Sequence, residues 1–149
     1  LEDHTDGATV EYLNKPDRTA EKFIGDWLRT GDLGTRDRDG YFAYVARDDD
    51  IISSAGYRIG PSEIENCLVG HPDVALAAAV GVPDAVRGQV VKAFVVLRDG
   101  ATREGLEAAL IDRVKERISP HVAPRAVVFA ESLPMTATGK ILRRALREG

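Results

Sequence analysis

Two continuous apolar runs near the middle of the chain restrict its fold more than any other feature. Residues 74–82 and 90–97 are rich in valine and alanine and do not alternate strictly with polar residues. Short apolar runs of this kind are typical of buried strands. Pro83-Asp84 and Arg87-Gly88 lie between the runs and predict a turn. The sequence therefore predicts a small sheet that contains two buried strands.

Two segments beside these runs have the pattern of amphipathic helices. Pro61 is a favourable first helical residue, two glutamates follow near the positive end of the helix dipole, and Gly70-His71-Pro72 predicts the end. Thr102 is expected to cap a second helix, which Ser119-Pro120 ends. Apolar side chains recur every fourth residue along one side of this helix: Leu106, Leu110, Val114 and Ile118.

The other segments predict short strands, a loop and a last helix. Residues 27–47 predict a hairpin, and residues 51–54 and 126–130 predict further strands. Residues 56–60 begin and end with glycine and predict a loop, and a basic segment predicts a closing helix up to Arg147. We therefore expect an α+β fold, a small few-stranded sheet covered by helices and preceded by a short β-hairpin.

Three adjacent aspartates mark the expected domain boundary. Asp48-Asp49-Asp50 follows the hairpin, and aspartate is depleted in strands. We expect residues 1–48 to be the end of a larger N-terminal domain and residues 49–149 to form a C-terminal domain. The chain begins at Leu1 rather than at a methionine, which suggests a piece of a longer protein.

Composition argues against several classes of function. The net charge of −4 argues against a general nucleic-acid-binding protein, and no apolar run reaches the roughly 18 residues that span a bilayer. The single cysteine, Cys67, excludes an internal disulfide and indicates a reducing compartment, which we take to be the cytoplasm. Cys67 shares a helical face with Ile64 and Leu68, so core packing is favoured over reactivity.

Lys140 is the candidate catalytic residue. It follows a turn of threonine and glycine residues, 136–139, and precedes the basic closing segment. Small residues let a loop approach an anion, and an ammonium supplies a mobile charge with three donors. A Walker P-loop is excluded, because Pro134 occupies its first glycine position and Ile141 follows the lysine. The alternative is a solvated lysine at a helix start, with the basic residues after it on a solvated helix face.

Four strings in a fixed order carry a family resemblance. They are WLRTGDLG (27–34), the segment 47–50, GYRIGPSEIE (56–65) and LPMTATGK (133–140). In order and spacing they resemble the C-terminal part of the acyl-CoA synthetases, which belong with luciferases and peptide-synthetase adenylation domains to the adenylate-forming enzymes. The resemblance spans nearly the whole chain and is strongest to the acetyl and medium-chain branch.

The resemblance implies a reaction in two steps. Such enzymes couple a small-molecule carboxylic acid to ATP, release pyrophosphate and then transfer the acyl group from the adenylate to coenzyme A. ATP and coenzyme A are therefore expected as substrates, and magnesium is expected with ATP but without a ligand from this chain. The phosphate loop and the acyl pocket of the family belong to the large N-terminal domain. We accordingly expect this chain to be inactive alone.

The resemblance also implies roles for single residues in the first step. Lys140 would bridge the carboxylate of the acid and the α-phosphate, as an electrostatic catalyst and not as a nucleophile. Asp32 would accept hydrogen bonds from the ribose hydroxyls, and Arg47 would contact the ribose or the phosphates. Without the resemblance, Asp32 would be a turn residue and Arg47 would pair with a nearby aspartate.

For the second step the resemblance implies a rotation of the C-terminal domain. Asp49 matches the hinge position, about which the family's domain turns between two catalytic poses. In the second pose, Gly56, Tyr57 and Arg58 would border the channel for the pantetheine arm of coenzyme A, where glycine leaves room. The alternative for Arg58 is an ion pair with a glutamate of the next helix. Lys115 would contact the nucleotide part of coenzyme A.

Three functional hypotheses follow. The leading one is the mobile lid of an ATP-dependent acyl-CoA ligase. The second is the lid of a peptide-synthetase-type adenylation domain, which acylates a carrier protein. The third is a non-catalytic module that binds an anion.

Overall fold

The computed structural model describes residues 11–148 of the chain. The chain divides into two compact units, Leu1–Asp32 and Leu33–Gly149. In the first unit, helix α1 (Pro16–Ala20) starts with a proline, and strand β1 (Phe23–Ile24) pairs antiparallel with β2 (Trp27–Leu28).

A second hairpin joins strands β3 (Asp32–Arg36) and β4 (Phe42–Arg47). Its turn is closed by the carboxylate of Asp37, whose Oδ1 accepts hydrogen bonds from the amides of Asp39 and Tyr41 at 3.0 and 2.9 Å. The predicted hairpin is thus confirmed over residues 32–47, whereas residues 27–28 pair with β1 instead.

The main sheet has five strands and is built around β8 (Gly88–Leu97). Strand β7 (Val74–Asp84) pairs antiparallel with β8 along nearly its whole length, which confirms the two strands predicted from the apolar runs. On the other edge of β8 lie the antiparallel β5 (Ile52–Ser54) and the parallel β9 (Ala126–Phe129). Strand β6 (Tyr57–Ile59) pairs with β5 at the end of the sheet.

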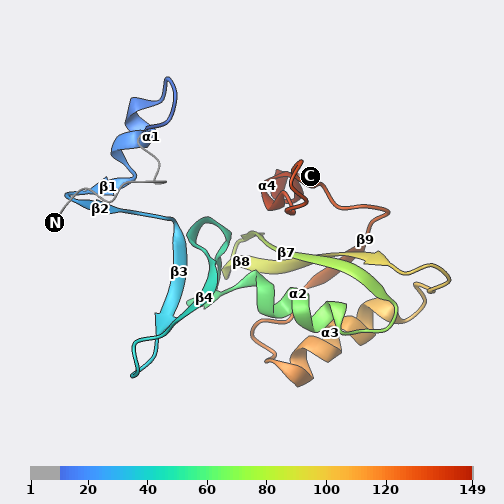
Figure 1. Cartoon of the computed structure of the whole chain (residues 1–149). Coiled ribbons are helices and arrows are strands. Elements are labelled where there is room, and N and C mark those ends of the chain that lie inside the picture. The colour runs from blue at the N-terminus through green and yellow to red at the C-terminus, as the bar shows by residue number, and fades with distance from the viewer. Residues whose placement is uncertain (1–10, 149) are drawn as a thin grey trace. The chain divides into compact units, whose positions relative to one another are not determined.

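Helices cover both faces of this sheet (Figure 1). Helices α2 (Pro61–Val69) and α3 (Leu106–Arg117) pack on one face, and α4 (Arg143–Glu148) lies on the other. Alternate residues of β7 therefore enter two different cores. Ala77 and Ala79 join the core of α2 and α3, whereas Ala78 and Val80 join a second core with Leu146 of α4.

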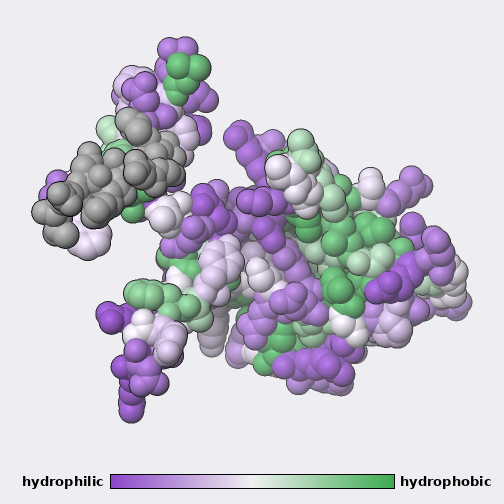
Figure 2. Space-filling view, in the orientation of Figure 1, coloured by the Kyte–Doolittle hydropathy of each residue, from purple (hydrophilic) through white to green (hydrophobic). Residues whose placement is uncertain are grey.

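These two cores explain why the apolar runs do not alternate with polar residues: side chains that point to opposite faces of a strand are both buried. The arrangement confirms the predicted α+β fold with a few-stranded sheet covered by helices. In the view of Figure 2, apolar residues gather over β7, while the surface around them is mostly polar. None of the described helices is long and apolar enough to cross a bilayer.

Two details differ from the prediction. The loop predicted for residues 56–60 is largely strand β6, because Ala55 and Gly56 both have positive φ, 48° and 84°, and make the two-residue turn that joins antiparallel strands. Thr102 does not cap α3. A turn precedes the helix instead, and the cap position is Gly105, which has a φ of 69°.

Candidate functional site

Lys140 lies at the end of a tight hairpin. Met135 and Ile141 form an antiparallel bridge, the amide of Thr136 donates to the carbonyl of Lys140 at 2.7 Å, and the amide of Lys140 donates to the hydroxyl of Thr136 at 3.0 Å. Gly139 has a φ of 79°, which favours glycine in this turn. Lys140 is exposed, and within residues 11–148 its ammonium makes no ion pair or hydrogen bond. The backbone of the lysine is fixed, and its charge is available to an anion.

The three adjacent aspartates form a 3-10 turn, η1 (Asp48–Asp50), with a basic partner for each carboxylate. Asp48 Oδ1 accepts a hydrogen bond from Arg58 Nη2 at 3.2 Å, and Asp49 Oδ1 lies 3.4 Å from Arg47 Nε. Asp50 pairs with arginines of α4. Arg58 therefore pairs with an aspartate and not with a glutamate of α2. The side chain of Asp49 is 74% exposed and that of Asp50 only 16%, so Asp49 is held least.

The basic residues of α4 do not all form the solvated face that the sequence predicts. Arg143 is 20% exposed, and its guanidinium donates to Glu65 at 2.8 and 3.1 Å and to Asp50 at 2.8 Å. Arg147 donates to the other oxygen of Asp50 at 2.9 Å, whereas Arg144 is exposed. Burial alone would lower the pKa of Arg143, but the hydrogen bonds and charges of Glu65 and Asp50 outweigh it and raise the pKa.

The β5–β6 hairpin presents Gly56 and Tyr57 at the surface. A Cβ built on Gly56 would meet no atom of this chain within 4 Å, so the positive φ, and not a close neighbour in the chain, is what favours glycine there. The ring of Tyr57 stacks on that of His121, with the ring centroids 5.0 Å apart and an angle of 15° between the planes. An aromatic pair thus stands next to the glycine.

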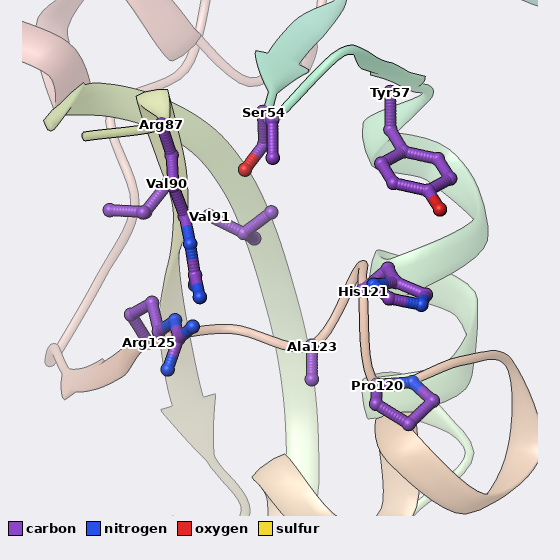
Figure 3. Close-up of a pocket in the computed structure, with 10 residues that line it drawn as sticks. Ser54, Tyr57, Arg87, Val90, Val91, Pro120, His121, Ala123 and Arg125 are labelled. Atoms are coloured by element: carbon purple, nitrogen blue, oxygen red, sulfur yellow. The ribbon is translucent and has the colours of Figure 1, made fainter.

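A pocket of about 100 Å³ opens beside this aromatic pair (Figure 3). Figure 3 shows Arg87 and Arg125 along one side of the pocket and Tyr57 and His121 along the other. Within residues 11–148 neither guanidinium makes an ion pair or a hydrogen bond. The remaining lining residues are small or apolar: Ser54, Ala55, Val90, Val91, Pro120 and Ala123. Two guanidinium groups beside an aromatic wall suit a phosphate that is attached to a larger molecule.

Hydrogen bonds from backbone amides hold the main chain at both pocket arginines. Asp84 Oδ1 accepts hydrogen bonds from the amides of Arg87 at 2.8 Å and Val86 at 3.0 Å, and these bonds lower the pKa of Asp84 below its ordinary value. The carboxylate therefore orders the turn that carries Arg87. The amide of Arg125 donates to the carbonyl of Val91 at 2.8 Å, at the point where β9 joins β8.

Two predicted site residues lie elsewhere. Asp32 is the last residue of the first unit, and its amide donates to the hydroxyl of Thr30 at 3.1 Å. Lys115 lies on α3, where its Nζ is 2.7 Å from Asp112 Oδ1, and it does not line the pocket of Tyr57. Within the described part of the chain, no cluster of three or more His, Cys, Asp or Glu side chains could hold a metal ion.

Sequence reasoning missed Arg87 and Arg125 as members of one site. Residues 87–88 predict only a turn, and nothing in the local pattern marks Arg125. The two arginines meet because β8 pairs with both β7 and β9, and this pairing is a property of the whole sheet. Cys67 is half-buried against the first core, which confirms its predicted packing role.

The chain matches a known family over about half of its length. The model of the AMP-binding enzyme C-terminal domain matches residues 63–140, a stretch that contains most of α2, the β7–β8 pair, α3 and β9 and that ends at Lys140.

Two mammalian proteins match nearly the whole chain. The mouse protein named acyl-coenzyme A synthetase ACSM3, mitochondrial, is 46% identical over 145 residues, and human acyl-coenzyme A synthetase ACSM4, mitochondrial, is 48% identical over 141 residues. These alignments cover 95% and 93% of this chain but only 25% and 24% of the relatives. The chain therefore spans about a quarter of the length of these relatives.

Solved structures of MatB from Rhodopseudomonas palustris have the same fold. The ATP-bound structure matches 93% of this chain and 27% of its own, with 33% identity and a TM-score of 0.83. The apo structure matches 92% of this chain and 27% of its own, with 34% identity and a TM-score of 0.68. The family match, the relatives and the fold agree with one another, and this chain belongs to the family of AMP-binding enzyme C-terminal domains.

Proposed function

We propose that residues 49–149 are the mobile lid of an ATP-dependent acyl-CoA ligase and that residues 1–48 are the end of the large domain before it. The enzyme would form an acyl-adenylate from a carboxylic acid and ATP and then transfer the acyl group to coenzyme A. The relatives support this proposal, because they are named acyl-coenzyme A synthetases and are about four times as long as this chain. The N-terminal domain would supply the phosphate loop and the acyl pocket, so this chain alone would form no adenylate.

The exposed ammonium of Lys140 is the observation that carries the proposal. It stands on a hydrogen-bonded hairpin and has no partner within residues 11–148. In the proposed reaction, negative charge is redistributed between the carboxylate of the acid and the α-phosphate. A fixed backbone with a mobile cation lets Lys140 stabilise this charge without a large reorganisation of the site. Asp32 and Arg47 would hold the ribose and the phosphates of ATP, and any magnesium would be held by ATP and the N-terminal domain.

The pocket beside Tyr57 would serve the second step. Coenzyme A carries phosphates at one end of a thin pantetheine arm, and the pocket offers Arg87 and Arg125 beside the exposed Gly56. Gly56, Tyr57 and Arg58 would border the arm, and the two pocket arginines would bind phosphate. Lys115 is a weaker candidate for the same phosphates, because it pairs with Asp112 and does not line this pocket.

The hinge at Asp49 would carry the lid from the first step to the second. The exposure of Asp49 supports this position, since a hinge residue must change its dihedral angles without breaking a core. The two MatB structures also support a change of shape. They are of one protein and match nearly the same share of this chain, yet their TM-scores are 0.83 and 0.68.

The names of the relatives favour coenzyme A over a carrier protein as the acyl acceptor. The same names bear on location. The single cysteine led us to expect the cytoplasm, whereas both relatives are named as mitochondrial, so either location is compatible with the proposal.

The proposal is tested with the full-length protein that contains this chain. ATP, magnesium and a series of carboxylic acids of increasing length are supplied, and pyrophosphate and thioester are measured. We expect pyrophosphate release with at least one acid and thioester formation on addition of coenzyme A. Transfer only to a carrier protein would favour the peptide-synthetase alternative. No ATP-dependent reaction with any acid would favour the anion-binding module.

A further inference from the structure

Arg143 connects two carboxylates that are far apart in the sequence. Its Nη1 lies 2.8 Å from Asp50 Oδ2, and its Nε and Nη2 lie 3.1 and 2.8 Å from the two oxygens of Glu65. The side chains of Arg143, Asp50 and Glu65 are 20%, 16% and 12% exposed. A bidentate pair with little solvent around it is held much more firmly than an exposed ion pair.

The partners of Arg143 are themselves fixed. Glu65 Oε1 also accepts a hydrogen bond of 3.0 Å from the amide of Ala79 in β7, and Asp50 Oδ1 accepts one of 2.9 Å from Arg147. These contacts join the end of the 3-10 turn, helix α2, the sheet and helix α4. We call the four charged residues Asp50, Glu65, Arg143 and Arg147 the arginine clamp.

The arginine clamp is adjacent in the chain to the hairpin of Lys140. Ile141 closes this hairpin by its bridge to Met135, and the amide of Leu142 donates to the carbonyl of Pro134 at 2.8 Å. Arg143 is the next residue and begins α4. No flexible residue therefore separates the base of the hairpin from the clamp.

We propose that Arg143 is a positioning residue for adenylate formation. It connects Asp50, which lies on the lid side of the hinge, to the base of the Lys140 hairpin. This inference rests on the proposed function. Because Asp50 is held by the clamp, the rotation of the lid is confined to Asp48 and Asp49, whose carboxylates make only exposed pairs. A rotation at the hinge then moves Asp50 and the Lys140 hairpin together as one rigid unit.

Arg143→Lys in the full-length enzyme is the central test. Lysine keeps the charge but cannot make the forked contact to Glu65 and also reach Asp50. We expect kcat for adenylate formation to fall by about 10- to 100-fold, as misplacement of a catalytic group by a small distance can cause. The KM values for ATP and acid, and thioester formation from supplied acyl-adenylate, should change little. Asp50→Asn, which keeps the shape of the side chain, is the second variant in case Arg143→Lys does not fold. It should likewise lower kcat for adenylate formation and leave the KM values and thioester formation nearly unchanged.

Hydrogen exchange of the same variants separates positioning from general destabilisation. Amides in residues 48–52 and 133–142 should exchange faster in Arg143→Lys, whereas those of β8 should not. Arg144→Lys is the matched control, because Arg144 is the next residue on the same helix, is 84% exposed and pairs with Glu148 at 2.8 Å. It should resemble the parent enzyme in every measurement.

Two outcomes would overturn the role of Arg143. One is unchanged adenylate formation in both Arg143→Lys and Asp50→Asn. The other is a parallel loss of both half-reactions with faster exchange throughout the lid, which would show a merely structural role. The proposed function fails separately, if the full-length protein shows no ATP-dependent reaction with any acid.

Discussion

The backbone amide of Lys140 donates a hydrogen bond of 3.0 Å to the hydroxyl of Thr136, while the lysine side chain remains exposed. The carbonyl of the same lysine accepts a hydrogen bond of 2.7 Å from the amide of Thr136. The hairpin thus fixes the origin of the side chain through the amide and carbonyl of Lys140, and the ammonium takes no part. The ammonium is not needed to hold the hairpin together, so it is available to a substrate anion. A fixed backbone with an available charge is what an electrostatic catalyst requires.

Lys140→Ala in the full-length enzyme should lower the rate of adenylate formation by about 100- to 1,000-fold, the loss typical of one preorganised donor at a developing charge. Thioester formation from supplied acyl-adenylate should be largely intact, because the proposed second pose of the lid would not use this lysine. Pyrophosphate release and thioester formation are measured separately. Arg144→Ala, which removes an exposed charge four residues later, is the control. An equal loss of both half-reactions would contradict the assigned role.

Asp49→Pro should have the opposite effect. Proline fixes φ and removes the amide hydrogen, so a rotation about this residue is hindered. We expect adenylate to form and to persist on the enzyme, while its conversion to the thioester slows. Asp49→Asn is the matched control, because it removes the charge that faces Arg47 at 3.4 Å but leaves the backbone free. Unchanged thioester formation in the proline variant would count against a hinge at this position.

The local sequence pattern predicts the helices and strands of this fold well where the pattern of apolar residues is continuous or regular. The apolar runs predict β7 and β8, and the period of four along residues 106–118 predicts the buried side of α3. The loop predicted at residues 56–60 failed because Ala55 adopts a φ of 48°, which its residue type does not indicate. The fold class depends on the sum of such patterns and is not changed by one short strand.

The candidate site is less predictable from sequence, because its contacts join distant segments. Arg143 meets Asp50 and Glu65 across 93 and 78 residues, and no local rule pairs them. From local pattern alone, the basic residues of α4 predict a solvated helix face, because their acidic partners lie far away in the sequence. Lys140 was predictable because its hairpin is local: the threonines and the glycine that shape it are its immediate neighbours. Arg87 and Arg125 needed the pairing of three strands before they could be seen as one pocket.

Arg87→Gln and Arg125→Gln should each raise the KM for coenzyme A by roughly tenfold or more, since a hydrogen bond to a charged group contributes about 1.5 to 3 kcal/mol. Adenylate formation should be unaffected. Lys115→Gln is the comparison, because it removes a cation outside the pocket. With a dephosphorylated analogue of coenzyme A, the KM values of the parent enzyme and of the arginine variants should become nearly equal. If Lys115→Gln has the larger effect, the phosphate contact lies on α3 and not in the pocket.

Asp32→Ala should weaken ATP binding without changing the second step from supplied acyl-adenylate. The hydroxyl of Thr30 accepts a hydrogen bond of 3.1 Å from the amide of Asp32, which helps to order the backbone at this position. Loss of the carboxylate would remove its proposed contacts to the ribose hydroxyls. A bidentate contact to two hydroxyls leads us to expect a KM for ATP about tenfold higher or more. Asp39→Asn, an exposed aspartate in the β3–β4 turn, is the control, and an unaltered KM in Asp32→Ala would remove the ribose role.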